Sequence, residues 1–454
     1  MKKWIGWLML GCLMWAHEDD PKKLDRQPCY RGPGFRKALN PKTALAFPSL
    51  NMQLYSWIPI PELQENADEG NDCWGYVSQS GREYAMMGLS NGTVFVDVTY
   101  PSNAQVVGFI AGPTSIWRDI KVFGTRAYAV SEGGSGIQVF DLSAIDQGII
   151  RDKGIVLDGT VPATHNVAIN EESGYLYRCG GSDNGLRIYD LNANPDRPSL
   201  VAVWPDRYVH DAQIVVMKSG PFAGRELAFC CAGLNGGWDM TGLTILDVTD
   251  KANLKVVTHY EYPQPAYSHQ GWISEDQQTF YLNDELDERT YGIKTRTHVM
   301  DISNLTKPVQ IGTFSSNTTA IDHNLYVHQG RIYEANYRSG LRVFDATDPH
   351  HPSEMAFFDT YPEDDRPNFN GIWSNYPYFP SQTLIGSDLE RGLFVLKLDP
   401  QSGDLNGDLQ VDQEDLTTMV TQWNDCATCS ADLDQSGLLD ARDLAQLLTE
   451  WNQN

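Results

Sequence analysis

Four histidines recur at similar intervals along the chain, and each is followed by a polar residue. The pairs are His165-Asn166, His210-Asp211, His269-Gln270 and His323-Asn324. Neutral imidazole binds Zn, Cu, Ni and Fe, and a nearby carboxylate can bind the same metal or orient a histidine. The carboxylates closest to these repeats are Asp119, Asp211 and Asp322. The pattern predicts either a site for a ligand or a transition metal, or a structural ring in which each histidine hydrogen-bonds a neighbouring loop.

The C-terminal part carries a second set of ligand-type residues, in two loops with calcium-binding spacing. The first loop offers oxygens from Asp404, Asn406, Asp408, Gln410, Asp412 and Asp415. The second loop, shifted by 28 residues, offers them from Asp432, Asp434, Ser436, Leu438, Asp440 and Asp443. Calcium takes six to eight oxygen ligands, and a loop of this spacing wraps them around one ion. Two Ca²⁺ ions are therefore predicted, one in each loop.

The residues after each loop repeat as well, which predicts a matched pair of helices. Leu416, Met419, Val420 and Trp423 return, with the same shift, as Leu444, Leu447, Leu448 and Trp451. Spacing i, i+3, i+4, i+7 would place each set on one helical face. At these residues the tail resembles a type I dockerin over about residues 404–452. The resemblance implies docking to a cohesin-like or cell-surface protein.

The tail departs from the dockerin pattern in ways that bear on its binding. Position six of the first loop is Leu409, where the second loop has Gly437, so weaker binding of the first ion is expected. The residue pairs at loop positions 10 and 11 are Gln413-Glu414 and Ala441-Arg442. Because these pairs do not match, a symmetric, two-way docking mode is not expected.

The histidines belong to a longer repeat that must position them. Seven units open at Trp74, Arg118, His165, His210, His269, His323 and Ile372. Each continues into a strand-like signature such as GTVFVDV (92–98), GLRIYDL (185–191) or GLRVFDA (340–346). Repeats of this length, with apolar strands and glycine-bearing turns, are typical of β-propeller blades. In such a ring the four histidines would converge at one mouth of the central channel.

The ring is predicted to close with an N-terminal strand. The last unit stops after GLFVLKL (392–398), whereas the orphan strand MQLYSWIPI (52–60) precedes the first unit. That segment can supply the missing outer strand and remove an exposed edge. The predicted fold class is all-β, a seven-bladed β-propeller, followed by a small all-α, dockerin-like double EF-hand-type module. The expected boundaries are a signal peptide 1–16, an N-terminal arm 17–50, the propeller 51–398, a linker 399–403 and the calcium-binding domain 404–454.

Long motifs in the propeller resemble one family. They are WRDIKVF (117–123), YVHDAQIV (208–215), YSHQGWISEDQQTFYLNDELDE (267–288), AIDHNLYVHQGRIYEANYRSGLRVFD (320–345) and FNGIWSNYPYF (369–379). These strings resemble the choice-of-anchor B family of secreted bacterial propellers with LVIVD-type repeats. The resemblance implies a displayed propeller with an interchangeable C-terminal anchor, and it brings no established activity.

The N-terminus and the charge predict a secreted, extracellular or cell-surface protein. Lys2-Lys3 precede the apolar stretch WIGWLMLGCLMWA, which fits a secretory signal cleaved after Ala16. A lipoprotein site at Gly11-Cys12 is the alternative. No other apolar run is long enough to span a bilayer, so no transmembrane segment is expected in the mature chain. The balance of 34 basic and 59 acidic residues, a formal charge of −25, argues against nucleic acid as a partner.

The cysteines predict disulfides, because seven of them follow the signal into an oxidising compartment. The candidates are Cys29 with Cys73, and Cys426 with Cys429. Cys179 and either Cys230 or Cys231 could pair or fill the core.

Two functions fit these features. The first is a non-catalytic binding or scaffold propeller that takes an extracellular glycan or protein ligand and is attached through its calcium-dependent tail. The second is a metal-dependent hydrolase or lyase acting on extracellular polysaccharide, with the tail as targeting module. The acidic run Asp284-Glu285-Asp287-Glu288 is interpreted as a solvated loop rather than a calcium site. No residue is assigned a catalytic role.

Overall fold

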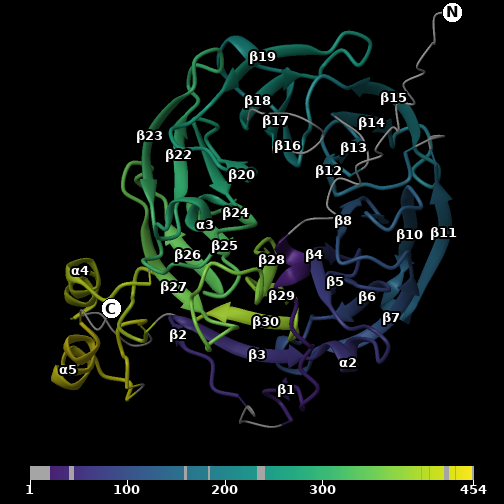
Figure 1. Cartoon of the computed structure of the whole chain (residues 1–454). Helices are drawn as coiled ribbons and strands as arrows, with labels where there is room; N and C mark the ends of the chain where they lie inside the picture. Colours follow the sequence, from purple (N-terminus) through teal and green to yellow (C-terminus); the bar gives the residue numbers. More distant parts are fainter. Residues whose placement is uncertain are drawn as a thin grey trace, which may run out of the picture.

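Seven antiparallel sheets surround a central channel in the computed structural model of this chain (Figure 1). The structure describes residues 21–39, 45–157, 161–181, 185–232, 241–399, 401–407, 409–423, 429–434 and 436–451. The predicted signal peptide, Asp408 and Cys426 lie outside the described residues. The fold class is confirmed, since the sheets are the seven blades of a propeller and a small helical module follows them.

Five blades consist of four consecutive strands, and the first strand of each lines the channel. Blade 1 contains β4 (Gly70–Val77), β5 (Glu83–Leu89), β6 (Gly92–Asp97) and β7 (Gln105–Ala111). Blade 2 contains β8 (Arg118–Phe123), β9 (Arg126–Ser131), β10 (Ile137–Ala144) and β11 (Ile149–Val156). Blade 3 contains β12 (Asn166–Asn170), β13 (Tyr175–Cys179), β14 (Leu186–Asp190) and β15 (Ser199–Trp204). Blade 4 contains β16 (Asp211–Val216), β17 (Glu226–Ala232), β18 (Gly242–Asp247) and β19 (Lys255–Tyr260). Blade 5 contains β20 (Ser268–Ile273), β21 (Thr279–Asp284), β22 (Thr297–Asp301) and β23 (Val309–Phe314).

The last two blades each take strands from the N-terminal arm. Blade 6 contains β24 (Leu325–His328), β25 (Arg331–Ala335), β26 (Leu341–Asp345) and β27 (Ser353–Phe358), with β2 (Ser49–Leu50) at its outer edge. Blade 7 contains β28 (Ile372–Tyr376), β29 (Leu384–Asp388) and β30 (Gly392–Leu398), with β3 (Met52–Ile58) and β1 (Phe35–Arg36) outside them. The short helices are α1 (Pro21–Leu24), α2 (Ile60–Leu63) and α3 (Asp287–Tyr291), and the 3-10 turns are η1 (Pro101–Asn103), η2 (Ile145–Gln147) and η3 (Gly220–Phe222).

The predicted closure of the ring by an N-terminal strand is confirmed. β3 runs antiparallel to β30, with Met52 opposite Leu398 and Ile58 opposite Leu393. The strand ends two residues earlier than predicted, because Pro59 has no N–H for the ladder and caps α2 instead. Trp57 fixes the strand: its ring is fully buried and its Nε1 donates to the Arg391 carbonyl at 2.7 Å.

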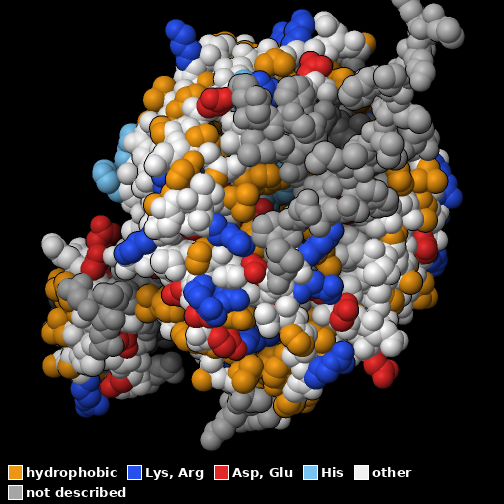
Figure 2. Space-filling model, in the orientation of Figure 1, with side chains coloured by type: hydrophobic (Ala, Val, Ile, Leu, Met, Phe, Trp, Pro, Cys, Tyr) orange, Lys and Arg blue, Asp and Glu red, His pale blue; other side chains and the backbone are white. Residues whose placement is uncertain are grey.

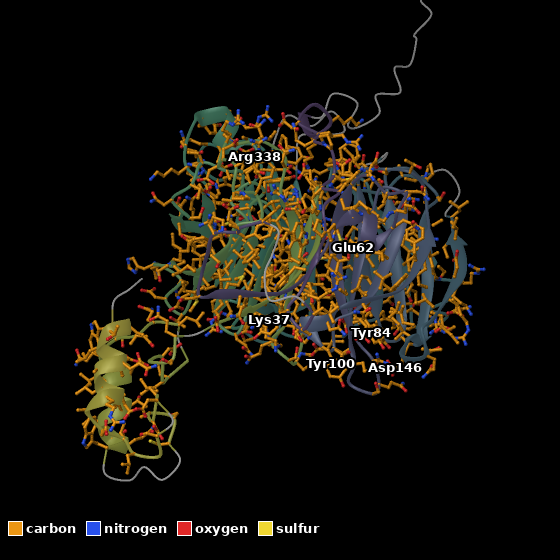
Figure 3. The ribbon with its side chains drawn as sticks, turned by 90° about the horizontal axis from the view of Figure 1, so that it is seen from below. Lys37, Glu62, Tyr84, Tyr100, Asp146 and Arg338 are labelled. Atoms are coloured by element: carbon orange, nitrogen blue, oxygen red, sulfur yellow. The ribbon has the colours of Figure 1, made fainter. Side chains whose placement is uncertain are left out.

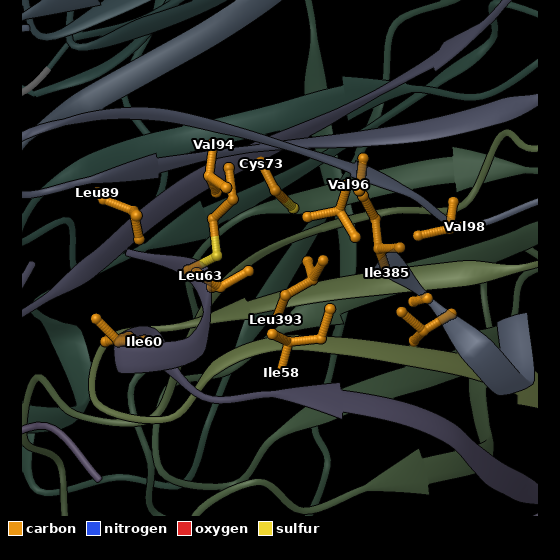
Figure 4. Packing of buried hydrophobic residues seen from close by; sticks show 14 of the residues in the cluster. Ile58, Ile60, Leu63, Cys73, Leu89, Val94, Val96, Val98, Ile385 and Leu393 are labelled. Carbon is orange, nitrogen blue, oxygen red and sulfur yellow. The ribbon is translucent and has the colours of Figure 1, made fainter. Parts of the chain in front are cut away.

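Packing across the closure continues the core from blade 7 into blade 1. Ile58 of β3 and Leu393 of β30 lie in one buried cluster with Val94 and Val96 of β6, and Figure 4 shows these side chains facing one another. The alternating apolar residues that predicted the strands therefore point into the spaces between blades. The closing strand is held by this packing as well as by its hydrogen bonds.

The C-terminal module contains two helices, α4 (Gln413–Gln422) and α5 (Ala441–Glu450). Each begins with a capping box, Asp412 with Asp415 and Asp440 with Asp443. Met419 and Leu447 are buried between the helices, as predicted. Val420 and Leu448 were expected on the same inner faces, and this is wrong, because they are 59% and 53% exposed.

Leu409 joins the module to the propeller. It occupies the loop position where the second loop has Gly437, and both residues have the left-handed backbone, with φ of 68° and 84°. Such a φ is unfavourable for leucine. The side chain is 4% exposed and packs in a propeller cluster that includes Met52 and Leu396. Burial against blade 7 thus gives a structural reason for a leucine at this position.

The predicted pairing of Cys29 with Cys73 is wrong, because both are free thiols. They lie in the same apolar cluster, and burial raises the pKa of the Cys73 thiol, which also faces Ser387. Cys179, Cys230 and Cys231 are likewise free and buried, so they fill the core. Cys429 is disulfide-bonded, and its predicted partner lies outside the described residues.

Candidate functional site

The four histidines converge at one mouth of the channel. His165 and His210 directly precede β12 and β16, His269 is the second residue of β20, and His323 lies just before β24. Their rings form a continuous arc, with centroid separations of 4.2, 4.3 and 4.2 Å along the series. The arc continues to Trp373, 4.5 Å from His323. The repeat places one histidine per blade because each stands at the same point of the innermost strand.

Main-chain and side-chain oxygens orient three of these rings. His323 Nδ1 lies 2.6 Å from the Trp373 carbonyl oxygen, and His210 Nδ1 lies 3.1 Å from that of His269. A carbonyl oxygen only accepts, so Nδ1 carries the proton in both rings, and in a neutral ring the lone pair is then on Nε2. His165 Nδ1 lies 2.6 Å from Glu132 Oε1.

Glu285 lies beside the ring, and sequence reasoning missed it as a site residue. Its carboxylate oxygens lie 3.4 Å from His323 Nε2 and 3.8 Å from His269 Nε2. One ligand atom from each of the three residues lies within 4.8 Å of the other two. The Tyr337 hydroxyl donates to Glu285 Oε1 at 2.8 Å. Glu285 follows β21 outside the repeated positions, so the repeat carried no signal for it.

His269 is buried without a hydrogen-bond partner on either ring nitrogen, and His323 Nε2 also has none among the described residues. Both rings are 1% exposed. Burial lowers the pKa values of His269 and His323 well below the ordinary value for histidine. The positive charges of Lys22 and of neighbouring histidines, when protonated, lower them further. The imidazoles are therefore neutral at neutral pH, which is the form that binds metals.

The three predicted carboxylates have different positions. Asp119 lines the ring cavity, pairs with Lys121 Nζ at 2.5 Å and accepts from the Val167 N–H at 2.7 Å. Asp211 lies further along the channel, where burial raises its pKa to about 7. Asp322 is fully buried and does not line the ring cavity, and neither of its carboxylate oxygens has a hydrogen-bond partner among the described residues.

The interpretation of the acidic run as a solvated loop is wrong. Asp284, Glu285, Asp287 and Glu288 are all buried, with exposures between 0% and 3%. The run ends β21 and begins α3, which packs these carboxyls against the blade. Asp287 is paired with Arg296 Nη2 at 2.6 Å, and Tyr262 donates to Asp284 at 2.7 Å. Burial, followed by the charge of Asp287, raises the pKa of Glu288 well above its ordinary value.

A second cavity fills the channel beyond the histidines, with a volume of about 460 Å³. All seven innermost strands contribute to its wall. Its aromatic residues are Trp74, Tyr76, Trp272, Tyr326, Tyr376 and Tyr378, and its polar residues are Lys121, Glu171, Asp211, Gln213 and Gln270. Ligand sites in proteins have this size and this mixture of apolar walls with a few polar groups.

The acidic loops of the C-terminal module place their last carboxylates inward. Asp415 and Asp443 are fully buried, and each accepts backbone N–H groups from its own loop, such as Leu405 at 2.7 Å and Leu433 at 2.8 Å. Oxygens of Asp432, Asp434 and Asp443 lie within 4.8 Å of one another. This all-oxygen donor set fits calcium, which prefers carboxylate and carbonyl ligands.

No protein-family model and no curated protein matches this chain. Solved structures of similar shape include the β-propeller domain of Myceliophteria thermophila Cps50 (Swd1), at 12% identity over 71% of this chain and 96% of that chain, with a TM-score of 0.47. A protein from Lactobacillus plantarum is 14% identical over 70% and 89%, with a TM-score of 0.48. Kuenenia stuttgartiensis hydrazine synthase is 8% identical over 71% and 94%, with a TM-score of 0.50, a likeness that extends to the fold alone.

Proposed function

We propose that this protein is a secreted or cell-surface binding propeller that takes an extracellular glycan in its channel and is attached to a partner through its C-terminal module. The observation that carries the proposal is the channel cavity of about 460 Å³. Its walls come from rigid strands of all seven blades, so it is preformed. A preformed cavity binds without spending energy on ordering loops.

The chemistry of the cavity wall favours a sugar over an apolar ligand. Trp74 and Trp272 are half-buried, so part of each ring faces the cavity. Aromatic rings offer apolar faces to the C–H faces of a pyranose, while Gln213, Gln270 and Asp211 offer donors and acceptors to its hydroxyl groups. The cavity would hold one or two sugar units by volume.

The C-terminal module is proposed as a dockerin-like, calcium-dependent attachment. Its paired acidic loops, its capped helices and the resemblance of its sequence to type I dockerins support this role, as the resemblance of the blades to the choice-of-anchor B family supports display at a surface. Val420 and Leu448, at equivalent positions of α4 and α5, are exposed apolar side chains. They offer a contact surface to a cohesin-like or cell-surface protein. Among the described residues no helix is long and apolar enough to cross a bilayer.

Tryptophan fluorescence tests glycan binding, because two of the cavity residues are tryptophans. We expect soluble oligosaccharides from extracellular polysaccharides to change the emission, and Trp272→Ala or Asp211→Asn to weaken binding about tenfold or more, as one lost hydrogen bond or stacking contact does. Tyr100→Ala is the control, since Tyr100 is 73% exposed and outside the cavity. The proposal is contradicted if Trp272→Ala binds as tightly as the wild type, or if none of the oligosaccharides tested binds to the wild type.

A metal-dependent hydrolase or lyase is the second candidate, and one observation favours it. His269, His323 and Glu285 are three ligands of the kind that catalytic zinc sites use, which keep a fourth position open for water. The test is whether the metal-loaded protein releases reducing ends from polysaccharide. Activity in the wild type that is lost in His323→Gln would support this function.

A further inference from the structure

The N-terminal arm covers the histidine ring and inserts a lysine into it. Lys22, on α1, is 7% exposed, and its Nζ lies 2.8 Å from Glu285 Oε1. The ammonium also lies 4.9 Å from the centre of the Trp373 ring. In Figure 3 the purple α1 lies near the face that carries Arg338, opposite the face with Tyr84, Tyr100 and Asp146. The arm thus closes the mouth at which the histidines converge.

Further contacts hold the arm across this mouth. Lys23 Nζ lies over the Trp117 ring at 5.1 Å, Asp25 pairs with Arg289 at 3.1 Å, and Arg26 pairs with Glu69 at 2.6 Å. These partners belong to different blades, and acidic and basic side chains are interspersed on this face (Figure 2). Because Lys23, Asp25 and Arg26 also hold the arm, removing the ammonium of Lys22 should leave the arm in place.

The groups around the ammonium form an incomplete polar site. His323 Nε2 carries a lone pair, as its Nδ1–H is bonded to the Trp373 carbonyl, and that lone pair faces the carboxylate of Glu285. Two lone-pair atoms that face each other repel unless a proton, a water molecule or a metal ion lies between them. Neither nitrogen of His269 has a partner among the described residues, and an unsatisfied buried imidazole is costly and marks a missing water or ion.

The spacing of these atoms matches a metal-ligand set. Ligand atoms about 2.0–2.1 Å from a tetrahedral Zn²⁺ lie roughly 3.4 Å from one another. Glu285 Oε1 lies 3.4 Å from His323 Nε2, and Glu285 Oε2 lies 3.8 Å from His269 Nε2, so each histidine faces one oxygen of the carboxylate. The second-layer contacts are also present, since a backbone carbonyl fixes the tautomer of His323 and Tyr337 donates to the carboxylate.

We propose that His269, His323 and Glu285 form a transition-metal site for an ion of the Zn²⁺ type, and that the Lys22 ammonium is a built-in competitor that occupies it in the metal-free protein. Metal binding then requires Lys22 to leave the carboxylate. The apparent affinity for the metal equals the intrinsic affinity multiplied by the fraction of molecules in which Lys22 has left the carboxylate. The arm therefore regulates the site. None of these four residues lines the glycan cavity, so the proposal does not rest on the proposed glycan binding, whereas the second candidate function requires this metal site.

Zinc titration of the full, untagged chain tests the site, with calcium present to saturate the C-terminal loops. We expect one Zn²⁺ in the wild type and at least tenfold tighter binding in Lys22→Met, which keeps the apolar stem and removes the ammonium. Lys23→Met is the matched control and should bind as the wild type does. His269→Gln, made in the Lys22→Met background, should lose the ion. Co²⁺ should give d–d absorption that disappears with the same substitution.

Thermal unfolding of each variant separates loss of the site from loss of the fold, and Glu285→Gln replaces any histidine variant that fails to fold. The proposal is overturned if Lys22→Met binds no Zn²⁺ at millimolar concentration, or if Zn²⁺ bound to it is unaffected by either His269→Gln or Glu285→Gln. Equal affinities in the wild type and Lys22→Met would overturn the role of the lysine. None of these outcomes depends on a glycan, so failure here is distinguishable from failure of the proposed function.

Discussion

Individual buried carboxyls in this protein differ from surface carboxyls because water cannot reach them. Glu334 is fully buried in β25, where it accepts hydrogen bonds from the Thr297 hydroxyl at 2.7 Å and the Asn336 amide at 3.0 Å. Burial raises its pKa to about 7, and these hydrogen bonds only partly offset the effect. Two donors satisfy the oxygens of the residue without supplying a countercharge.

Glu334 should therefore make the protein less stable as the pH rises. In the folded state the carboxyl stays protonated up to about pH 7, whereas in the unfolded chain it ionises near pH 4.5. Between these values the folded state binds more protons, so the free energy of unfolding falls by roughly 3 kcal/mol as the pH rises through this window, and stays level above it. Glu334→Gln keeps a neutral hydrogen-bonding group and should remove this part of the slope.

Denaturant unfolding of the wild type and Glu334→Gln between pH 4.5 and 8 measures the difference. The two proteins should be similar in stability at the acid end, and the variant should be the more stable at pH 8. Parallel curves over the whole range would show that Glu334 does not titrate in this window.

The site could be predicted only in part at the residue scale. The four histidines were found because they repeat with the blades, and their convergence follows from that repeat. Glu285 and Lys22 could not be found in this way, because one follows β21 outside the repeated positions and the other belongs to an arm with no repeat. Contacts between residues far apart in sequence leave no periodic signal.

Among the elements, β3 matters most for the closure of the propeller, because it joins the two ends of the ring. Its alternating apolar pattern and the missing fourth strand of the last unit were enough to predict the pairing. β1 and β2 were not predicted, since strands of two residues carry no period. The arm thus reinforces blades 6 and 7 in a way that its sequence does not reveal.

Trp57→Ala should loosen the closing strand. The substitution removes a fully buried ring that stacks on Phe394 with centroids 5.6 Å apart, and it leaves the Arg391 carbonyl without its donor. Such losses cost about 3–5 kcal/mol. Denaturant unfolding measures the cost, and Tyr55→Ala on the same strand, where the side chain is only half-buried, is the control. A loss below 1 kcal/mol, the scale of a surface substitution, would mean that β3 does not hold the ring.

At the scale of the whole molecule, the propeller and the C-terminal module differ in what stabilises them. The propeller buries a large apolar core between its blades, whereas the apolar core of the module contains four buried side chains among its described residues, Val411, Met419, Ala431 and Leu447. We therefore predict that a module with so small a core depends on bound calcium, because metal-binding free energy becomes folding free energy.

Calcium removal should therefore unfold the helices of the module and leave the propeller intact. Titration calorimetry should give two Ca²⁺ per chain, and one in either Asp404→Ala or Asp432→Ala. Circular dichroism should show a loss of helix with chelator, while the unfolding temperature of the propeller stays constant. Wild-type stoichiometry in both variants would refute the assignment of these loops.

The pairing of β30 with β3 also decides how the propeller would carry a mechanical load. The chain leaves the propeller at the end of β30, so a pull on the C-terminal module is applied at Leu398. β30 is hydrogen-bonded to β29 on one side and to β3 on the other. Tension must break two ladders together before this strand detaches, whereas an outermost strand would peel away from one. The proposed attachment through the C-terminal module would thus load a strand that is held on both sides.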